Sequence, residues 1–157
     1  MKELEIITIP KKTLRQPSKN IENISSAELK KIIRRMFYTM KKVQGVGLAA
    51  PQIDKNINLF VIDKELAKIN NVPAAYFNAK IIKTSPEEEI MEEGCLSVPD
   101  RHGLVKRAQK IKLTATDETG KEFTANLDGF IARVIQHELD HINGILIVDK
   151  IIEVGKI

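Results

Sequence analysis

Apolar residues recur at intervals of three and four positions in the segment that follows Ser25, and this spacing predicts an amphipathic helix. The repeat comprises Leu29, Ile32, Ile33, Met36, Met40 and Val43. Ser25 and Glu28 have the spacing of a capping box, in which a hydroxyl and a carboxylate each accept a hydrogen bond from a free backbone N–H. The helix should therefore start there, and Gly45 is placed to end it. We expect the apolar stripe to form part of the core.

Short apolar runs in the middle of the chain predict strands at residues 59–62, 75–82, 110–116 and 122–127. Residues 117–120 should form the turn between the last two strands, and residues 84–89 an exposed loop. A second helix is predicted from about Asp128 to about Asn143, with Gly144 in the left-handed position after its end. These elements predict an α+β fold, and the 157 residues are enough for a single domain, residues 1–157.

The composition is that of a folded protein, because 43% of the residues are hydrophobic and the 29% that are charged are dispersed along the chain. No segment approaches the roughly 20 apolar residues of a membrane span, and the first residues lack the layout of a signal peptide. We therefore expect a cytoplasmic protein without membrane contact. The net charge of +4 predicts a solvated basic surface, and it also favours transient contact with RNA, including ribosomal RNA. Binding to DNA is not expected, because Trp is absent and aromatic residues make up only 4%.

Candidate chemistry lies in the second predicted helix, where residues 137–141 read His-Glu-Leu-Asp-His. Residues four apart lie on one helix face, so His137 and His141 can bind one metal ion while Glu138 points at a water molecule. The same short pattern also occurs on solvated helices, where these residues merely carry charge. Here the histidines sit beside apolar neighbours, which favours the metal site.

Cys95 is the single cysteine of the chain, so it cannot form an internal disulfide. A lone cysteine is often a buried apolar residue, but Gly94 beside it makes an ordinary strand interior less favourable. As a third ligand it would leave one coordination position open, which is typical of catalytic sites. His102, the remaining histidine, is expected in an exposed loop.

Three segments resemble the motifs of the peptide deformylase family and occur in the family's order. They are residues 45–52 (Gly-Val-Gly-Leu-Ala-Ala-Pro-Gln), residues 93–97 (Glu-Gly-Cys-Leu-Ser), and residues 136–141 (Gln-His-Glu-Leu-Asp-His) with Gly144. The resemblance covers essentially the whole chain, and the lack of a long insertion before the second motif is similar to the shorter, type 1 members. It implies a mixed or antiparallel sheet wrapped around the helix that carries the histidines.

The resemblance also implies one divalent metal ion bound by Cys95, His137 and His141. In the family the native metal is commonly Fe²⁺, and Zn²⁺, Ni²⁺ or Co²⁺ can replace it. Thiolate and imidazole suit iron and zinc alike, so the spacing does not choose among these ions.

The implied activity is hydrolytic removal of the N-formyl group from the N-terminal formylmethionine of newly made polypeptides, with release of formate. Glu138 would take a proton from the attacking water and deliver it to the departing amine. The resemblance assigns the Gln52 side-chain amide and the Leu96 backbone N–H as donors to the formyl oxygen. The alternative for Gln52 is a surface glutamine before a turn, although it closes an otherwise apolar run.

Substrate binding is implied along Gly45, Val46 and Gly47, where the family adds its peptide as a strand. Gly45 is also a candidate helix cap. Phe130 and Val134 lie on the same helix face as His137, and with Val46 they are candidates for the methionine pocket. Plain core packing is an equal alternative for these side chains.

Two other functions stay open at this point. A metallopeptidase of the His-Glu-x-x-His class would cut internal peptide bonds, and a cysteine as third ligand argues against it. A non-catalytic homologue would only bind metal or peptides, and the presence of Gln52 and Glu138 argues against that. Some bacterial members dock on the ribosome through an extended C-terminal helix, which is not expected from the short segment after Gly144.

Overall fold

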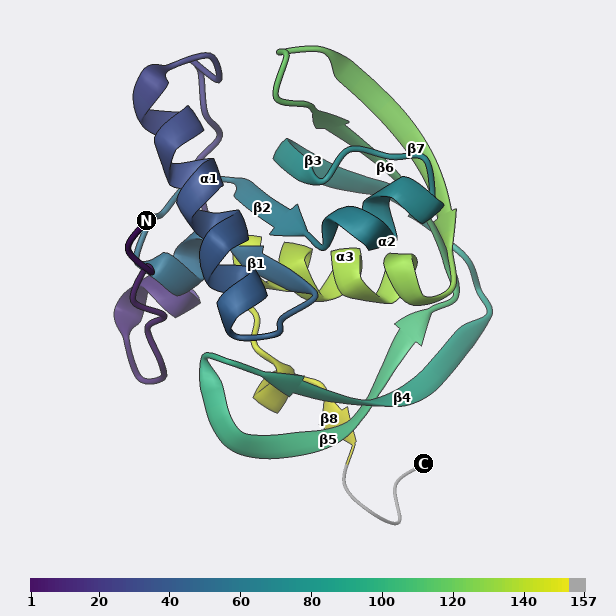
Figure 1. Ribbon diagram of the computed structural model, residues 1–157. Coiled ribbons are helices and arrows are strands. Elements are labelled where there is room, and N and C mark those ends of the chain that lie inside the picture. The colour runs from purple at the N-terminus through teal and green to yellow at the C-terminus, as the bar shows by residue number, and fades with distance from the viewer. Residues whose placement is uncertain (153–157) are drawn as a thin grey trace.

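Two antiparallel sheets enclose a helix near the C-terminal end of the chain in the computed structural model, which describes residues 1–152 (Figure 1). The larger sheet has the order β1-β2-β3-β6-β7, formed by Gly47–Ala49, Leu59–Ile62, Ala75–Thr84, Lys110–Thr116 and Glu122–Asp128. The smaller sheet has the order β4-β5-β8, formed by Glu88–Cys95, Val98–Ala108 and Ile151–Ile152. The helices are α1 (Ala27–Lys42), α2 (Lys64–Ile69) and α3 (Phe130–Ile142), with short 3₁₀ turns at Lys12–Arg15, Ala50–Ile53 and Ile147–Asp149.

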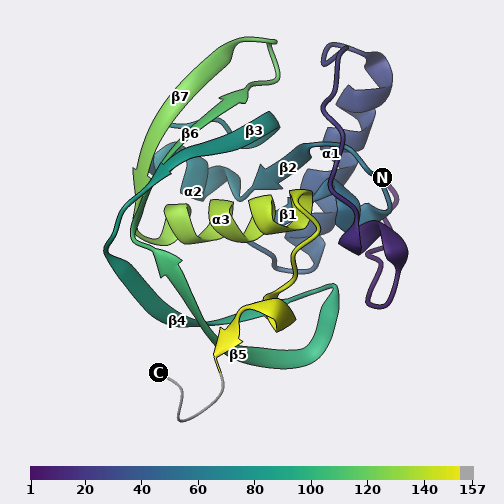
Figure 2. The ribbon, with the colours of Figure 1, turned by 180° about the vertical axis from the view of Figure 1, so that it is seen from behind.

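The position of α3 explains the fold class. Seen from either side, α3 lies between the β4–β5 hairpin and the strands β3, β6 and β7 (Figure 2). Its apolar side chains, such as Ile131 and Ile135, pack into the main core with residues of the larger sheet. The predicted α+β fold, with antiparallel strands wrapped around this helix, is confirmed. Within residues 1–152 no helix is long and apolar enough to cross a membrane.

Helix α1 follows its predicted apolar pattern, with corrections at both ends. At its C-terminal end the left-handed residue is Gln44, with a φ of +56°, and not Gly45, whose N–H donates to the Met40 carbonyl oxygen at 2.9 Å. The N-cap is Ser26, whose hydroxyl accepts a hydrogen bond from the Leu29 N–H at 3.2 Å, so the expected capping box of Ser25 and Glu28 is wrong. Ser25 instead bonds to the Asn23 side chain. The buried stripe packs against β1 and β2, which leaves the opposite face of the helix in solvent.

Helix α3 ends as predicted. It runs from Phe130 to Ile142, slightly shorter than the expected range, and Gly144 has a φ of +74°. A Cβ at Gly144 would also lie 2.6 Å from the Arg15 carbonyl oxygen. Glycine is therefore required there both by its backbone angle and by the close approach of the N-terminal segment.

The β4–β5 hairpin was not expected from the sequence. The segment predicted as a loop is shorter than expected, because β3 extends to Thr84 and β4 begins at Glu88, which leaves only residues 85–87 between the strands. Cys95 is the last residue of β4, directly after a shift in register at Gly94. The expected loop position of His102 is wrong, since this exposed residue lies in β5 opposite Gly94. The acidic β4 lacks the apolar alternation by which a strand is recognised.

Candidate metal centre and active site

Three potential metal ligands converge where the end of β4 meets α3. The donor atoms of Cys95, His137 and His141 all lie within 4.8 Å of one another. The Cys95 Sγ and the His141 Nε2 are 3.3 Å apart, and the two imidazole rings lie edge to face with centroids separated by 5.1 Å. One thiolate and two imidazoles form a donor set that fits zinc or ferrous iron and leaves a coordination position open.

The two histidines have different electrostatic surroundings. Burial, followed by the charges of His137 and Arg107, holds the pKa of His141 well below its ordinary value, which keeps this imidazole neutral. Burial alone would lower the pKa of His137, but hydrogen bonds with Cys95 and Glu93 raise it to about 10. A metal ion bound here must therefore displace a proton from the site.

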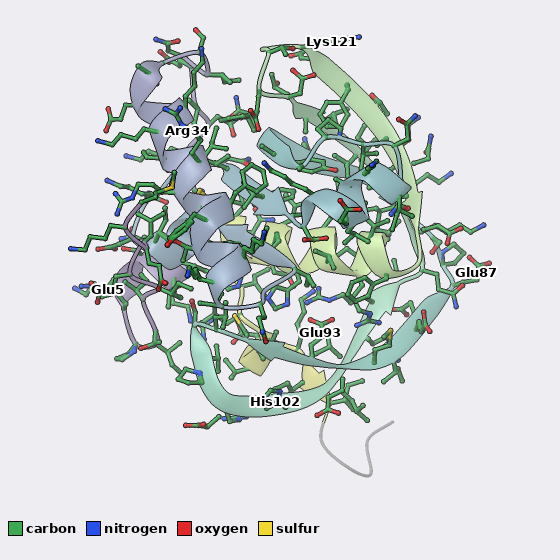
Figure 3. The ribbon with its side chains drawn as sticks, in the orientation of Figure 1. Glu5, Arg34, Glu87, Glu93, His102 and Lys121 are labelled. Carbon is green, nitrogen blue, oxygen red and sulfur yellow. The ribbon has the colours of Figure 1, made fainter. Side chains whose placement is uncertain are left out.

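Glu93 is the hydrogen-bonding partner of His137. Its Oε1 lies 3.0 Å from the His137 Nδ1, and a carboxylate can only accept, so the Nδ1 keeps a proton and the Nε2 is the nitrogen that can bind a metal once its own proton is displaced. Burial would raise the pKa of Glu93, but hydrogen bonds from His137 and Arg107 lower it below its ordinary value. Figure 3 shows Glu93 between α3 and the β4–β5 hairpin.

Two arginines complete the surroundings of Glu93, and the sequence analysis did not identify either of them. Arg107 donates to both carboxylate oxygens at 2.6 and 2.9 Å, and Arg133 donates to the Oε2 at 2.6 Å. A sequence signal did exist for Arg133, because it lies four residues before His137 and so on the same helix face. No comparable local pattern points to Arg107.

Glu138 is buried beside the ligands, with 4% of its surface exposed. A Cβ on Gly47 would lie 2.5 Å from the Glu138 Oε1, so the absence of a side chain at Gly47 makes room for the carboxylate. Burial raises the pKa of Glu138 to about 7, against the opposing charges of His137 and Arg107. Among residues 1–152 no partner bonds to its Oε2, which leaves this oxygen available to a molecule in the site.

Gln52 is also buried, in the 3₁₀ turn after β1. Its Oε1 accepts a hydrogen bond from the Ala49 N–H at 3.0 Å, which fixes the amide and directs its nitrogen toward the second motif. The Nε2 donates to the Ser97 Oγ at 3.2 Å and lies 3.8 Å from the Cys95 Sγ. The surface position considered for Gln52 is therefore wrong, and Ser97 is a further contact that sequence reasoning missed.

A cavity of about 290 Å³ opens onto the ligands. The structure brings nearly all of the sequence-predicted residues to its walls, and His141 completes the ligand cluster beside it. The predicted residues that line it are Gly45, Val46, Gly47, Gln52, Cys95, Leu96, Phe130, Val134, His137 and Glu138. Met91 also lines the cavity, and together with Val46, Leu96 and Phe130 it forms an exposed apolar rim. Exposed apolar side chains grouped in this way are typical of a binding site.

Comparison with known proteins gives a consistent result. The family model described as polypeptide deformylase matches residues 3–156. A peptide deformylase from Rhodopseudomonas palustris (strain BisB18) is 40% identical over 149 residues, which cover 94% of this chain and 85% of the relative. One from Thermotoga neapolitana is 42% identical over 138 residues, covering 88% of this chain and 80% of the relative.

Solved structures are similar over almost the full chain. The crystal structure of peptide deformylase from Thermotoga maritima has a TM-score of 0.89 and 38% identity, covering 98% of this chain and all of that one (100%). The crystal structure of a peptide deformylase from Synechococcus elongatus in complex with actinonin has a TM-score of 0.86 and 38% identity, covering 98% of this chain and 81% of that one.

Proposed function

The chain belongs to the polypeptide deformylase family of metal-dependent hydrolases, which remove the N-formyl group from nascent polypeptides, and we propose which of its residues carry the reaction. The observation that supports the proposal is the convergence of the donor atoms of Cys95, His137 and His141 at a cavity that Glu138 and Gln52 also line. These three residues are the proposed metal ligands.

The proposed native ion is Fe²⁺, with Zn²⁺, Ni²⁺ or Co²⁺ able to take its place. One sulfur and two nitrogen donors suit iron and zinc alike, so the ion bound in the cell depends on availability as well as on the site. A divalent ion held by Cys95, His137 and His141 would lower the pKa of a bound water molecule toward neutrality and would polarise a carbonyl group.

Glu138 is the proposed proton carrier. It lies between the two histidines in sequence, its carboxylate is buried at the cavity, and its Oε2 is free of partners within residues 1–152. It accepts a proton from the attacking water and returns it to the departing amine. Gln52 is the proposed donor to the formyl oxygen, together with the Leu96 backbone N–H, because its side-chain nitrogen lies beside Cys95.

The proposed peptide site follows the free edge of β1. This strand lies at the edge of the larger sheet and begins at Gly47, and Gly45 and Val46 directly precede it, so this segment can pair with an extended peptide. The methionine side chain then enters the cavity lined by Val46, Phe130 and Val134. Phe130 is 50% exposed, which favours a binding role over plain core packing, whereas Val134 is buried and serves both.

Three wider features complete the proposal. The chain acts as one catalytic domain, supported by a family match over residues 3–156. It works in the cytoplasm, because its substrates are nascent formylated polypeptides. It contacts ribosomal RNA transiently through the exposed face of α1, where every exposed residue from Lys30 to Lys42 is a lysine or arginine.

Formate release tests the proposal directly. Protein purified without oxygen, with its metal content measured in parallel, should release formate from a formyl-Met peptide and leave acetylated and unmodified peptides intact. Actinonin, which is bound to the Synechococcus elongatus relative, should inhibit this turnover. Cleavage of internal peptide bonds would support the metallopeptidase alternative, and metal-loaded protein without turnover would support a non-catalytic homologue.

A further inference from the structure

We propose that Glu93 and Arg107 are positioning residues, which hold the strand that carries Cys95 in register with the helix that carries His137 and His141. The inference rests on the metal site proposed above. The ligands come from separate elements, since Cys95 ends β4 and the histidines occupy two turns of α3. The relative positions of the ligands therefore depend on contacts that fix β4 against α3.

Glu93 connects the two elements at the ligands themselves. It lies two residues before Cys95 on β4 and accepts a hydrogen bond from His137 on α3. Its Oε1 bonds to His137 and Arg107, and its Oε2 bonds to Arg107 and Arg133. A carboxylate can accept roughly four hydrogen bonds, so these contacts occupy all the acceptor positions of Glu93 and fix its orientation.

Arg107 extends the connection to the second histidine. While its Nε and Nη2 hold Glu93, its Nη1 donates to the Asp140 Oδ2 at 2.8 Å, and Asp140 directly precedes His141. The Arg107 side chain is only 2% exposed. One rigid guanidinium on β5 thus contacts the neighbours of ligands on both β4 and α3. A lysine has the charge but not the planar fork, and cannot make this set of bonds.

A contribution to the stability of the fold does not by itself explain why these charged side chains are buried. The buried group comprises Arg107, Arg133, Glu93 and Asp140, with side chains at most 16% exposed. His137 is bonded to Glu93, and Lys150 lies 3.6 Å from the Asp140 Oδ2 at the edge of the group. Apolar residues of similar volume often stabilise a core as well as buried ion pairs do. Hydrogen bonds fix the orientation of the side chains that they join, whereas apolar contacts do not. A fixed orientation suits a metal site whose donor atoms must lie at the correct distances from one another before the metal binds.

Arg107→Lys provides the test, with Arg101→Lys as the matched control. Both arginines lie on β5, but Arg101 is exposed and makes no ion pair within residues 1–152. Each variant and the parent are loaded with Co²⁺ or Zn²⁺, and metal release to a chelator is timed. We expect Arg107→Lys to bind metal about 10- to 100-fold more weakly, as loss of an outer contact does, and therefore to release it faster. We also expect its visible Co²⁺ spectrum to change. The control should match the parent in both measurements.

Asp140→Asn gives a second variant if Arg107→Lys does not fold. It removes one charge at a partly exposed position and should shift the Co²⁺ spectrum in the same direction, with a smaller loss of affinity. A lower melting temperature with unchanged metal release and an unchanged spectrum, in whichever of the two variants folds, would reduce these residues to a structural role and overturn the inference.

Cys95→Ala separates this inference from the metal site on which it rests. The variant should lose stoichiometric metal, because two imidazoles make an incomplete site. Full metal occupancy in Cys95→Ala would overturn both the site and the inference. Loss of metal in Cys95→Ala, combined with parental metal release in Arg107→Lys, would overturn the inference alone.

Discussion

At the scale of single residues, the site depends on which groups are held and which are left free. Glu93 has all of its acceptor positions filled, whereas the Glu138 Oε2 has no partner within residues 1–152. Gln52 is fixed by Ala49 and Ser97. The side chains of Glu93 and Gln52 therefore have fixed orientations, whereas Glu138 keeps an oxygen available for proton transfer.

Replacing Glu138 by Gln should abolish most turnover and leave the metal in place. Glutamine has the same size but cannot take a proton from water, and the three proposed ligands are unchanged. The kcat should fall by at least about 10²- to 10⁴-fold, because one carboxylate serves two proton transfers. The measurement is formate release at equal metal loading. Turnover within a few-fold of the parent would exclude Glu138 as the proton carrier.

Gly47→Ala should also lower kcat, although Gly47 carries no functional group. Its added Cβ would lie 2.5 Å from the Glu138 Oε1, so the carboxylate must move. Gly45→Ala is the matched control, since the nearest atom to its Cβ would be at 3.5 Å, an ordinary contact. We expect at least a tenfold difference in kcat between the two variants, about 1.4 kcal/mol in the barrier, at equal metal content. Equal kcat values for the two variants would show that a side chain at residue 47 of β1 does not disturb the position of Glu138.

The convergence of the ligands followed from local sequence patterns, but their supports did not. A spacing of four residues places His137 and His141 on one face, and the single cysteine within a recognisable motif gave Cys95. Glu93 is 14 residues from Arg107 and 44 from His137, so their contacts exist only after the hairpin and α3 have packed. Such contacts have no periodic signature in the sequence.

At the scale of elements, prediction succeeded where periodicity was strong. Helix α1 and strands β2, β6 and β7 lie close to their expected ranges, because each shows a clear apolar pattern, a continuous run in β2 and a repeat in the others. Helix α2 was missed since its six residues are too few to establish a repeat. Strand β4 was missed because it is rich in glutamate and is defined by pairing with β5 along its whole length. Tertiary pairing there outweighs local propensity.

The corrected cap of α1 gives a stability prediction. Ser26→Ala removes the acceptor for the Leu29 N–H and should lower the free energy of unfolding by about 0.5–2 kcal/mol. Ser25→Ala is the control, because the Ser25 hydroxyl bonds only to the exposed Asn23 side chain within residues 1–152. This substitution should lower the free energy of unfolding much less. Urea unfolding of the metal-loaded proteins measures both. A larger effect for Ser25→Ala would restore the capping box expected from the sequence.

At the scale of the whole molecule, the exposed face of α1 is basic. Figure 3 places Arg34 of α1 and Glu87, just before β4, on opposite sides of the protein. The exposed face of α1 carries Lys30, Lys31, Arg34, Lys41 and Lys42, and none of them forms an ion pair within residues 1–152. The C-terminal end of this face, Lys41 and Lys42, directly precedes the segment from Gln44 to Gly47 that lines the cavity.

The proposed ribosome contact can be tested by neutralising this face. A variant with Lys30→Ala, Lys31→Ala and Arg34→Ala should bind ribosomes more weakly and with a shallower dependence on salt, since each lost phosphate contact reduces the slope of log K against log salt by about 0.7–0.9. The control variant carries Lys83→Ala, Lys110→Ala and Lys112→Ala, three exposed residues on β3 and β6, so its net charge changes equally. Cosedimentation with ribosomes over a range of salt concentrations measures the slopes.

Turnover of a free formyl-Met peptide should be unchanged in both variants, because neither set of residues lines the cavity. Equal losses of ribosome binding in the two variants would mean that only net charge matters, and α1 would then have no specific part in the contact.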